Sequence, residues 1–168
     1  PLNGRWVTIV AERAKRPYDF APRSQQVEAD PTRACPFCPG SEDATPPALE
    51  TQRRDGAWQV RVVPNHYPAF EGEDSMAVHN LGPVHVQADA SGIHEVIILS
   101  PDHTESWKDL DDDAAEMVMA ALRNRMAEQS RHANLRYTQA IVNQGREAGA
   151  SLTHPHGQLL GMPFVPGE

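Results

Sequence analysis

The sequence predicts an α+β fold in which an antiparallel sheet carries one principal helix. Apolar side chains recur at helical spacing along residues 110–131, as they do on the buried face of a helix. Residues 58–63 instead alternate between apolar and polar side chains, which is the pattern of a half-buried strand. Because further β-rich segments stand on both sides of the helical one, we expect a sheet with the helix packed against it.

The first part of the chain is predicted to hold one strand and a long irregular segment. Residues 5–10 are rich in β-branched and aromatic side chains, which favours a strand. Residues 17–50 contain many prolines, aspartates and serines together with both cysteines. Long loops without structure are uncommon in compact domains, so we expect this segment to need an external staple.

The middle of the chain is predicted to form three strands and a loop. Asp55 and Gly56 indicate a turn directly before the strand at residues 58–63. Residues 71–83 are polar and contain glycine, so we expect a mobile loop there. Further strands are predicted at residues 84–88 and 95–99.

The helix at residues 110–131 opens with acidic residues, which suit a helix N-terminus. Its apolar stripe is expected to pack against the sheet and to carry no chemistry. The stripe consists of Ala114, Met117, Val118, Ala121, Leu122 and Met126. After the helix we expect a strand at 137–143, a loop of small residues at 145–153 and a last strand at 155–164, in a meander-like antiparallel sheet.

Composition excludes several classes of function. The 168 residues fit one domain or one half of a larger enzyme. With 15 basic and 23 acidic residues the net charge is −8, which argues against a nucleic-acid partner or a basic membrane binder. The apolar runs are too short to cross a bilayer. Only two cysteines occur, which excludes a disulfide scaffold and predicts a reducing compartment, the cytoplasm.

The segment from His154 to Gln158 is the strongest candidate for chemistry. In a strand His154, His156 and Gln158 project from one face, about 7 Å apart in succession. The small, polar residues before them can bring backbone N–H groups close to a phosphate, and a neutral imidazole facing that phosphate is a good nucleophile. The alternative is a pair of surface histidines at a sheet edge or irregular point, where Pro155 belongs. We favour the catalytic interpretation because the whole pattern follows a small-residue loop.

Cys35 and Cys38 form a CxxC pair. A zinc site needs two further nitrogen or sulfur donors, and with no other cysteine these would be histidines. A redox CxxC is expected between a strand and the start of a helix, whereas this pair lies in a proline-rich loop. The loop context favours zinc.

Two polar features could serve a phosphate ligand. Asn65 directly follows the strand at 58–63, where its ordinary role is that of a turn residue. Arg13, Lys15 and Arg16 form a cationic cluster, which is either a solvated strand end or, in an acidic protein, a counter-charge for phosphates.

Together these segments closely resemble the N-terminal half of the galactose-1-phosphate uridylyltransferases, a branch of the histidine-triad superfamily. The resemblance covers nearly the whole chain and is carried by residues 1–6, 12–17, 35–40, 62–67, 100–103 and 154–158. The last segment is the most specific, because hydrolases of the superfamily carry a third histidine where this chain has Gln158. The resemblance implies a histidine-triad-like antiparallel sheet with one principal helix and a zinc-stapled loop, and it makes residues 1–168 the N-terminal catalytic domain.

The resemblance also implies the role of each site residue. His156 would be the nucleophile that takes UMP from UDP-glucose as a covalent uridylyl-histidine. Gln158 would hold a phosphoryl oxygen without acting as a base for water, which protects the intermediate from hydrolysis. The implied zinc ligands are Cys35, Cys38, His103 and His154. The implied contacts to the nucleotide or its phosphates are Arg13, Arg16, Asn65, Asn143, Gly149, Ser151 and Gln158.

Two features depart from the family pattern. His94 places a second histidine on the strand that leads to His103, where it is either a polar strand residue or a competing zinc ligand. The acceptor-side half of the family is absent from these residues, and a sheet that ends with the nucleophile strand would leave an open edge. We therefore expect the chain to associate with itself or with a separate C-terminal half.

The resulting hypothesis is a nucleotidyltransferase that exchanges UMP between UDP-glucose and galactose 1-phosphate. One alternative is a related phosphorylase that acts on another nucleotide sugar or on a dinucleotide. A different class of alternative is a non-catalytic, zinc-stabilised module that only binds a nucleotide.

Overall fold

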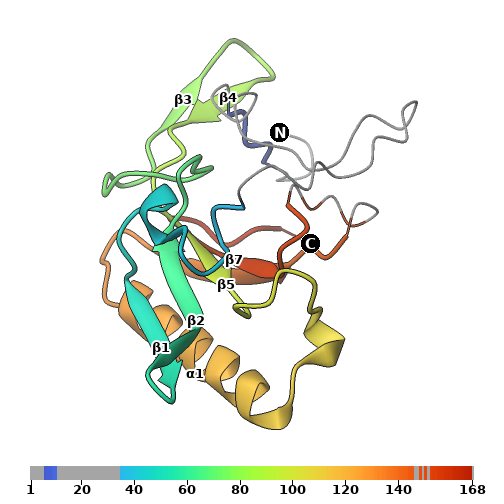
Figure 1. Ribbon diagram of the computed structural model, residues 1–168. Helices are drawn as coiled ribbons and strands as arrows, with labels where there is room; N and C mark the ends of the chain where they lie inside the picture. The colour runs from blue at the N-terminus through green and yellow to red at the C-terminus, as the bar shows by residue number, and fades with distance from the viewer. Residues whose placement is uncertain (1–5, 11–34, 146–147, 149, 151, 168) are drawn as a thin grey trace, which may run out of the picture.

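The computed structural model describes residues 6–10, 35–145, 148, 150 and 152–167. Its main sheet is antiparallel and has five strands in the order β1-β2-β5-β7-β6. These strands are β1 (Glu50–Arg54), β2 (Ala57–Pro64), β5 (Ile93–Ile98), β6 (Tyr137–Val142) and β7 (His156–Met162). The helix α1 (Asp112–Gln129) packs against one face of the sheet (Figure 1). The predicted α+β class, an antiparallel sheet with one principal helix, is confirmed.

Helix α1 forms where the acidic start and the apolar stripe predict it. The Asp111 carboxylate caps the helix by accepting a hydrogen bond from the Ala114 N–H at 2.7 Å. Val118 and Ala121 are fully buried against the sheet residues Val62 and Ile97. Met117 and Leu122 pack partly against the same core, whereas Met126 at the end of the stripe is exposed, so the expected packing holds for the middle of the helix but not for its last apolar residue.

An ion pair fastens α1 to the centre of the sheet. Glu95 on β5 is only 1% exposed, and both its carboxylate oxygens accept hydrogen bonds from Arg125 on α1, at 3.1 and 2.6 Å. Hydrogen bonding to Glu95 raises the pKa of Arg125. A buried carboxylate without such a partner would be an uncompensated charge, so the stability of the fold depends on Arg125 remaining paired with Glu95.

The strands β5 and β7 bury both faces. Ile97 faces α1 as part of one core, whereas Val96 and Ile98 belong to a second core on the opposite face. Across the β5–β7 ladder Val96 pairs with Gln158, and Ile98 pairs with His156. The predicted catalytic residues therefore stand on the face turned away from the helix.

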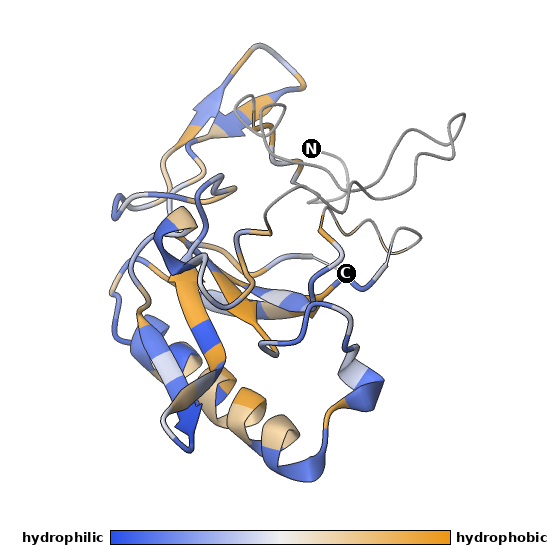
Figure 2. Cartoon of the chain, in the orientation of Figure 1, coloured by the Kyte–Doolittle hydropathy of each residue, from blue (hydrophilic) through white to orange (hydrophobic). Residues whose placement is uncertain are grey.

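Strand β2 is more buried than its alternating pattern predicts. All four residues from 60 to 63, including Arg61, are 5% exposed or less, and β2 is largely hydrophobic in Figure 2. An irregularity in the pairing with β1, between Gln52 and Arg53, brings Trp58 onto the face that also carries Val63. Since α1 covers the other face, the predicted half-buried strand is in fact covered on both sides.

Strand β1 is not predicted from the sequence, because it consists of the polar residues Glu-Thr-Gln-Arg-Arg. It folds back onto β2 through a turn at Asp55 and Gly56, whose φ angles are 53° and 83°. Positive φ at both positions is the signature of a tight hairpin turn whose twist suits the strands. The turn at 55–56 was predictable, but its first strand was not.

Two predictions, a strand at residues 5–10 and a loop at residues 71–83, are wrong in the part of the chain that the structure describes. Of the predicted strand at 5–10, residues 6–10 are described and form none; Val7 and Ile9 are 83% and 90% exposed, so β propensity alone is not enough here. The segment 71–83, predicted as a loop, contains β3 (Val78–Asn80). This strand pairs with β4 (Val86–Ala88) in a separate two-stranded sheet (Figure 1).

The last strand is also placed differently from the expectation. β7 lies between β5 and β6, so the sheet is not a simple meander and the strand that carries His156 is not an open edge. It has pairing partners on both sides, which fixes its side chains more firmly than an edge position would. Within the described ranges no helix is both long and apolar enough to span a membrane.

Candidate active site and metal centre

The residues His154 to Gln158 enter β7 from the loop before it. Pro155 lies just outside the strand, where its carbonyl oxygen accepts a hydrogen bond from the Leu99 N–H at 3.1 Å. Gly157 faces the helix side, where a Cβ atom would come within 3.0 Å of Ile97 and 3.1 Å of a backbone oxygen. A side chain would not fit there without displacing its neighbours, so glycine allows β7 to approach β5 and β6 closely.

The ring of His156 is fixed by a backbone hydrogen bond. Its Nδ1 lies 2.8 Å from the carbonyl oxygen of His154, and because a carbonyl can only accept, Nδ1 carries the proton. The neutral ring then has its lone pair on Nε2. This is the tautomer that a nucleophile needs.

A cavity of about 250 Å³ opens beside His156. Apolar side chains, among them Phe37 and Val96, form part of its wall, and polar groups converge on it from Asn65, His156 and Gln158. The Phe37 ring packs against the His156 imidazole with 5.5 Å between ring centroids. An apolar hollow with a few convergent polar groups is typical of a small-molecule site.

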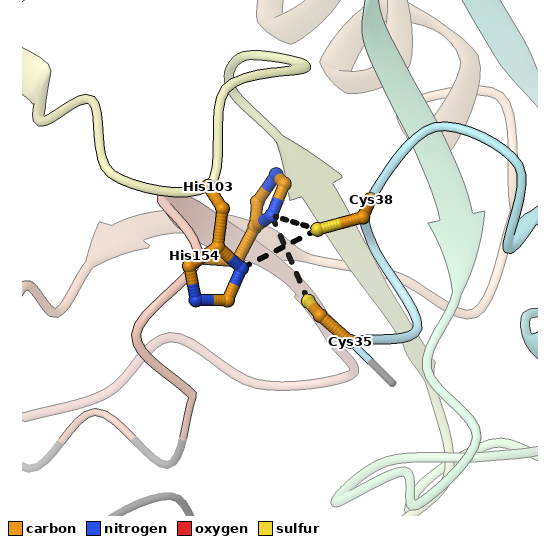
Figure 3. Close-up of side chains that lie close together, drawn as sticks. All are labelled: Cys35, Cys38, His103 and His154. Atoms are coloured by element: carbon orange, nitrogen blue, oxygen red, sulfur yellow. Dashed lines mark hydrogen bonds between the residues drawn. The ribbon is translucent and has the colours of Figure 1, made fainter. Parts of the chain in front are cut away.

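The two cysteines meet two histidines from distant segments (Figure 3). The donor atoms of Cys35, Cys38, His103 and His154 all lie within 4.8 Å of one another. Cys38 Sγ is 3.4 Å from His103 Nδ1 and 3.6 Å from His154 Nδ1, and Cys35 Sγ is 3.7 Å from His154 Nδ1. Sulfur and nitrogen ligands of a tetrahedral zinc lie about 3.6 Å apart. The cluster therefore has the donor types and spacing of a closed Cys2His2 metal site.

The protonation of the cluster also suits a metal. His154 is fully buried, and its Nε2 donates to the Ser100 carbonyl at 2.8 Å, which leaves the Nδ1 lone pair facing the thiols. Burial lowers the pKa of His154 to about 4. Burial also raises the pKa of the Cys35 thiol to about 11, so without a cation the thiol keeps its proton. A divalent metal would reverse that preference and be bound as proton is released.

His94 does not join this cluster; the structure places His103 there. Instead, His94 is buried beside the cavity, with its Nε2 2.8 Å from Gln158 Oε1 and 3.0 Å from Asn65 Nδ2. Asn65 in turn accepts a hydrogen bond from the Tyr67 N–H at 2.8 Å, which is the turn geometry expected of it. Reading along the chain could not place His94, because its contacts depend on the pairing of β5 with β7.

The remaining predicted contacts are divided. Asn65 and Gln158 line the cavity with His156, whereas Asn143 lines a smaller hollow on the loop side of His156. The other four lie outside the described residues: Arg13, Arg16, Gly149 and Ser151.

The comparison with known families agrees with this geometry. The model of the family described as "Galactose-1-phosphate uridyl transferase, N-terminal domain" matches residues 1–166. The chain belongs to this family. The family resemblance predicted from the sequence is thereby confirmed.

Similar proteins within the family differ in name. An ADP-glucose phosphorylase of Arabidopsis thaliana is 34% identical over 99% of this chain and 48% of its own length. A galactose-1-phosphate uridylyltransferase of Streptomyces lividans is 30% identical over 80% of this chain and 31% of its own. A solved structure titled "Structure of uridylyltransferase" superposes with a TM-score of 0.68 at 28% identity, over 99% of this chain and 45% of its own. The chain thus spans half or less of the length of these relatives.

Proposed function

We propose that this chain is the nucleotide-binding half of a nucleotidyltransferase that exchanges UMP between UDP-glucose and galactose 1-phosphate through His156. The observation that carries the proposal is the His156 ring. Its Nδ1 proton is held by a backbone carbonyl, and the ring borders a cavity with the amides of Asn65 and Gln158. A fixed nucleophile beside convergent amide groups is suited to attack on a phosphoryl group.

In the first step the Nε2 lone pair of His156 attacks the α-phosphorus of UDP-glucose. A phosphorus–nitrogen bond forms, the bond from that phosphorus to the bridging oxygen breaks, and glucose 1-phosphate leaves with the electron pair. The ring becomes cationic while Nδ1 keeps its proton, and the His154 carbonyl stabilises that charge through its 2.8 Å hydrogen bond.

In the second step a phosphate oxygen of galactose 1-phosphate attacks the uridylyl group. The phosphorus–nitrogen bond breaks, UDP-galactose forms, and the lone pair returns to Nε2 of His156. Gln158 contributes an amide that can stabilise the phosphoryl oxygens but is too weak a base to activate water. Such a site favours transfer over hydrolysis.

The Cys2His2 cluster is proposed to hold one zinc ion. With four protein ligands the site is closed, so zinc would supply structural cohesion rather than Lewis-acid catalysis. His154 provides one ligand and lies directly before β7, so the cluster would hold the loop at Cys35 and Cys38 against the start of the nucleophile strand. We further propose a cytoplasmic enzyme that works as an oligomer or with a second half, because these relatives are more than twice as long as this chain.

A second candidate is an ADP-glucose phosphorylase, which the 34% identical Arabidopsis relative favours. That enzyme class would share the attack by His156 but would use adenylyl transfer and inorganic phosphate as the acceptor. The two candidates therefore differ in the nucleotide loaded onto His156.

The test is to incubate the chain with UDP-glucose and, in parallel, with ADP-glucose, and then to measure intact mass and map modified peptides. We expect a UMP adduct on His156 and release of glucose 1-phosphate, with none in His156→Asn. An AMP adduct on His156 would support the phosphorylase. An adduct on His66 or His94 would contradict the assignment of His156 as the nucleophile. No adduct with either sugar nucleotide would leave only a binding module.

A further inference from the structure

The contacts of His94 determine which of its ring nitrogens carries the proton. The backbone N–H of Ala69 donates to His94 Nδ1 at 2.8 Å, so Nδ1 is an acceptor and holds no hydrogen. A neutral imidazole must then carry its proton on Nε2. Accepting at both nitrogens would require an imidazolate, and a protonated Nδ1 would oppose the Ala69 N–H.

The proton on Nε2 in turn determines how the Gln158 amide is oriented. His94 Nε2 lies 2.8 Å from Gln158 Oε1, and of the two groups of the Gln158 amide only the oxygen can accept from an N–H there. Exchanging the oxygen and nitrogen of Gln158 would place two donors against each other. The Gln158 oxygen therefore accepts a hydrogen bond from His94, and the Gln158 NH2 group is the part of the amide that can donate into the cavity that Gln158 lines.

Asn65 does not compete for this proton. Its Oδ1 accepts from the Tyr67 N–H at 2.8 Å, so the group that lies 3.0 Å from His94 Nε2 is its NH2. Two donors cannot satisfy each other, so the acceptor for Nε2–H is Gln158. The Asn65 amide is fixed as well, with its nitrogen on the side of His94 and Gln158.

We propose that His94 is a positioning residue that makes Gln158 present N–H donors, rather than its carbonyl oxygen, to the phosphoryl group; the inference rests on the proposed function. His94 is 5% exposed, and it sits two residues along β5 from Val96, the partner of Gln158 on β7. Because His94 lies diagonally across the β5–β7 pairing from Gln158, its imidazole contacts both β7 and the segment that follows β2. A free amide could turn its oxygen toward the phosphate, where it would repel the charge that gathers there in the transition state.

The kinetic test compares single-turnover loading of His156 by UDP-glucose in the full chain and in matched variants. His94→Phe keeps a ring of similar volume but cannot donate, and we expect loading to slow about tenfold, which corresponds to about 1.4 kcal/mol. His94→Gln offers an amide N–H near the position of Nε2 and should recover most of the rate. The effect should vanish in Gln158→Ala, because a residue that acts through Gln158 has nothing to position there.

A purely structural role predicts a different result, namely equal losses from His94→Phe with and without Gln158. That outcome, or full activity of His94→Phe, would overturn the proposal. A second measurement does not depend on catalysis: ¹⁵N–¹H correlation spectra of the full chain should show His94 neutral with the proton on Nε2, and His94→Phe should shift the Gln158 side-chain NH2 signals. If the unmodified chain forms no adduct, the proposed function fails, while a proton found on Nδ1 instead refutes the positioning by His94.

Discussion

The pair formed by Glu95 and Arg125 gives the sharpest test of how the sheet is held to its helix. Arg125→Met keeps much of the length and apolar contact of the side chain but removes the guanidinium. Glu95 is 1% exposed and takes both its side-chain hydrogen bonds, at 3.1 and 2.6 Å, from this one residue. Breaking a buried pair from one side costs about 3–5 kcal/mol, because the remaining charge has no partner.

The assay is urea unfolding at neutral pH followed by circular dichroism. A loss of about 3–5 kcal/mol would be a large part of the 5–15 kcal/mol that is usual for a domain, and for a chain of this size it lowers Tm by roughly 10 °C. The matched control is Arg123→Met on the same helix, where the side chain is exposed and donates to the neighbouring Asn124 at 3.3 Å. We expect that variant to stay within about 0.5 kcal/mol of the parent.

The double variant Glu95→Gln/Arg125→Met separates the ion pair from simple packing. Once the carboxylate is neutral, no buried charge remains uncompensated, so the double variant should regain part of the stability that Arg125→Met loses. Two results would contradict this account of how α1 is anchored. One is that Arg125→Met is no less stable than Arg123→Met. The other is that the stability loss of the double variant equals the sum of the losses of its two single variants.

Two further predictions concern the metal cluster. Cys35→Ser should lower the bound zinc, measured by mass spectrometry of metals, from one per chain toward none and reduce stability, whereas Ser41→Ala should leave both unchanged; full zinc in Cys35→Ser would refute the ligand assignment. Burial lowers the pKa of His154 to about 4. As pH falls from about 6.5 to about 4, the unfolded chain binds a proton at this histidine and the folded chain does not, so the free energy of unfolding of the metal-free protein should fall by up to about 3 kcal/mol. Urea unfolding at several pH values should show this dependence in the parent and a weaker one in His154→Gln.

The features that the sequence predicts well are those decided by neighbouring residues. The acidic start and apolar stripe of α1 are local signals, and so is the turn at Asp55 and Gly56. Strand β1 was missed because its polar residues acquire strand structure only by pairing with β2. Residues 6–10 show the opposite error: a strand was predicted and none forms, since a β-rich composition does not supply a pairing partner.

The residues of the candidate site also separate into those that a local sequence pattern indicates and those that only the strand pairing brings together. The alternation from His154 to Gln158 and the spacing of Cys35 and Cys38 are visible in the sequence, so a histidine nucleophile and half of a metal site could be proposed from the residues alone. The two histidine ligands could be named only through the family resemblance. The contacts of His94 depend on three separate segments, which carry Asn65, Ala69 and Gln158. No local pattern records the β5–β7 register that brings His94 to Gln158.

The arrangement of β7 gives each of its two catalytic candidates its own support. His154 contacts Cys38 of the Cys2His2 cluster through Nδ1 and Ser100 through Nε2, while its backbone carbonyl fixes the Nδ1 proton of His156. Gln158 is held from the other side by His94 on β5. Loss of the metal should therefore disturb the nucleophile before the amide, whereas loss of the His94 donor should disturb the amide and spare the nucleophile. The separation follows from the interior position of β7, since a strand paired on both sides keeps the two backbone positions fixed while each side chain is oriented independently.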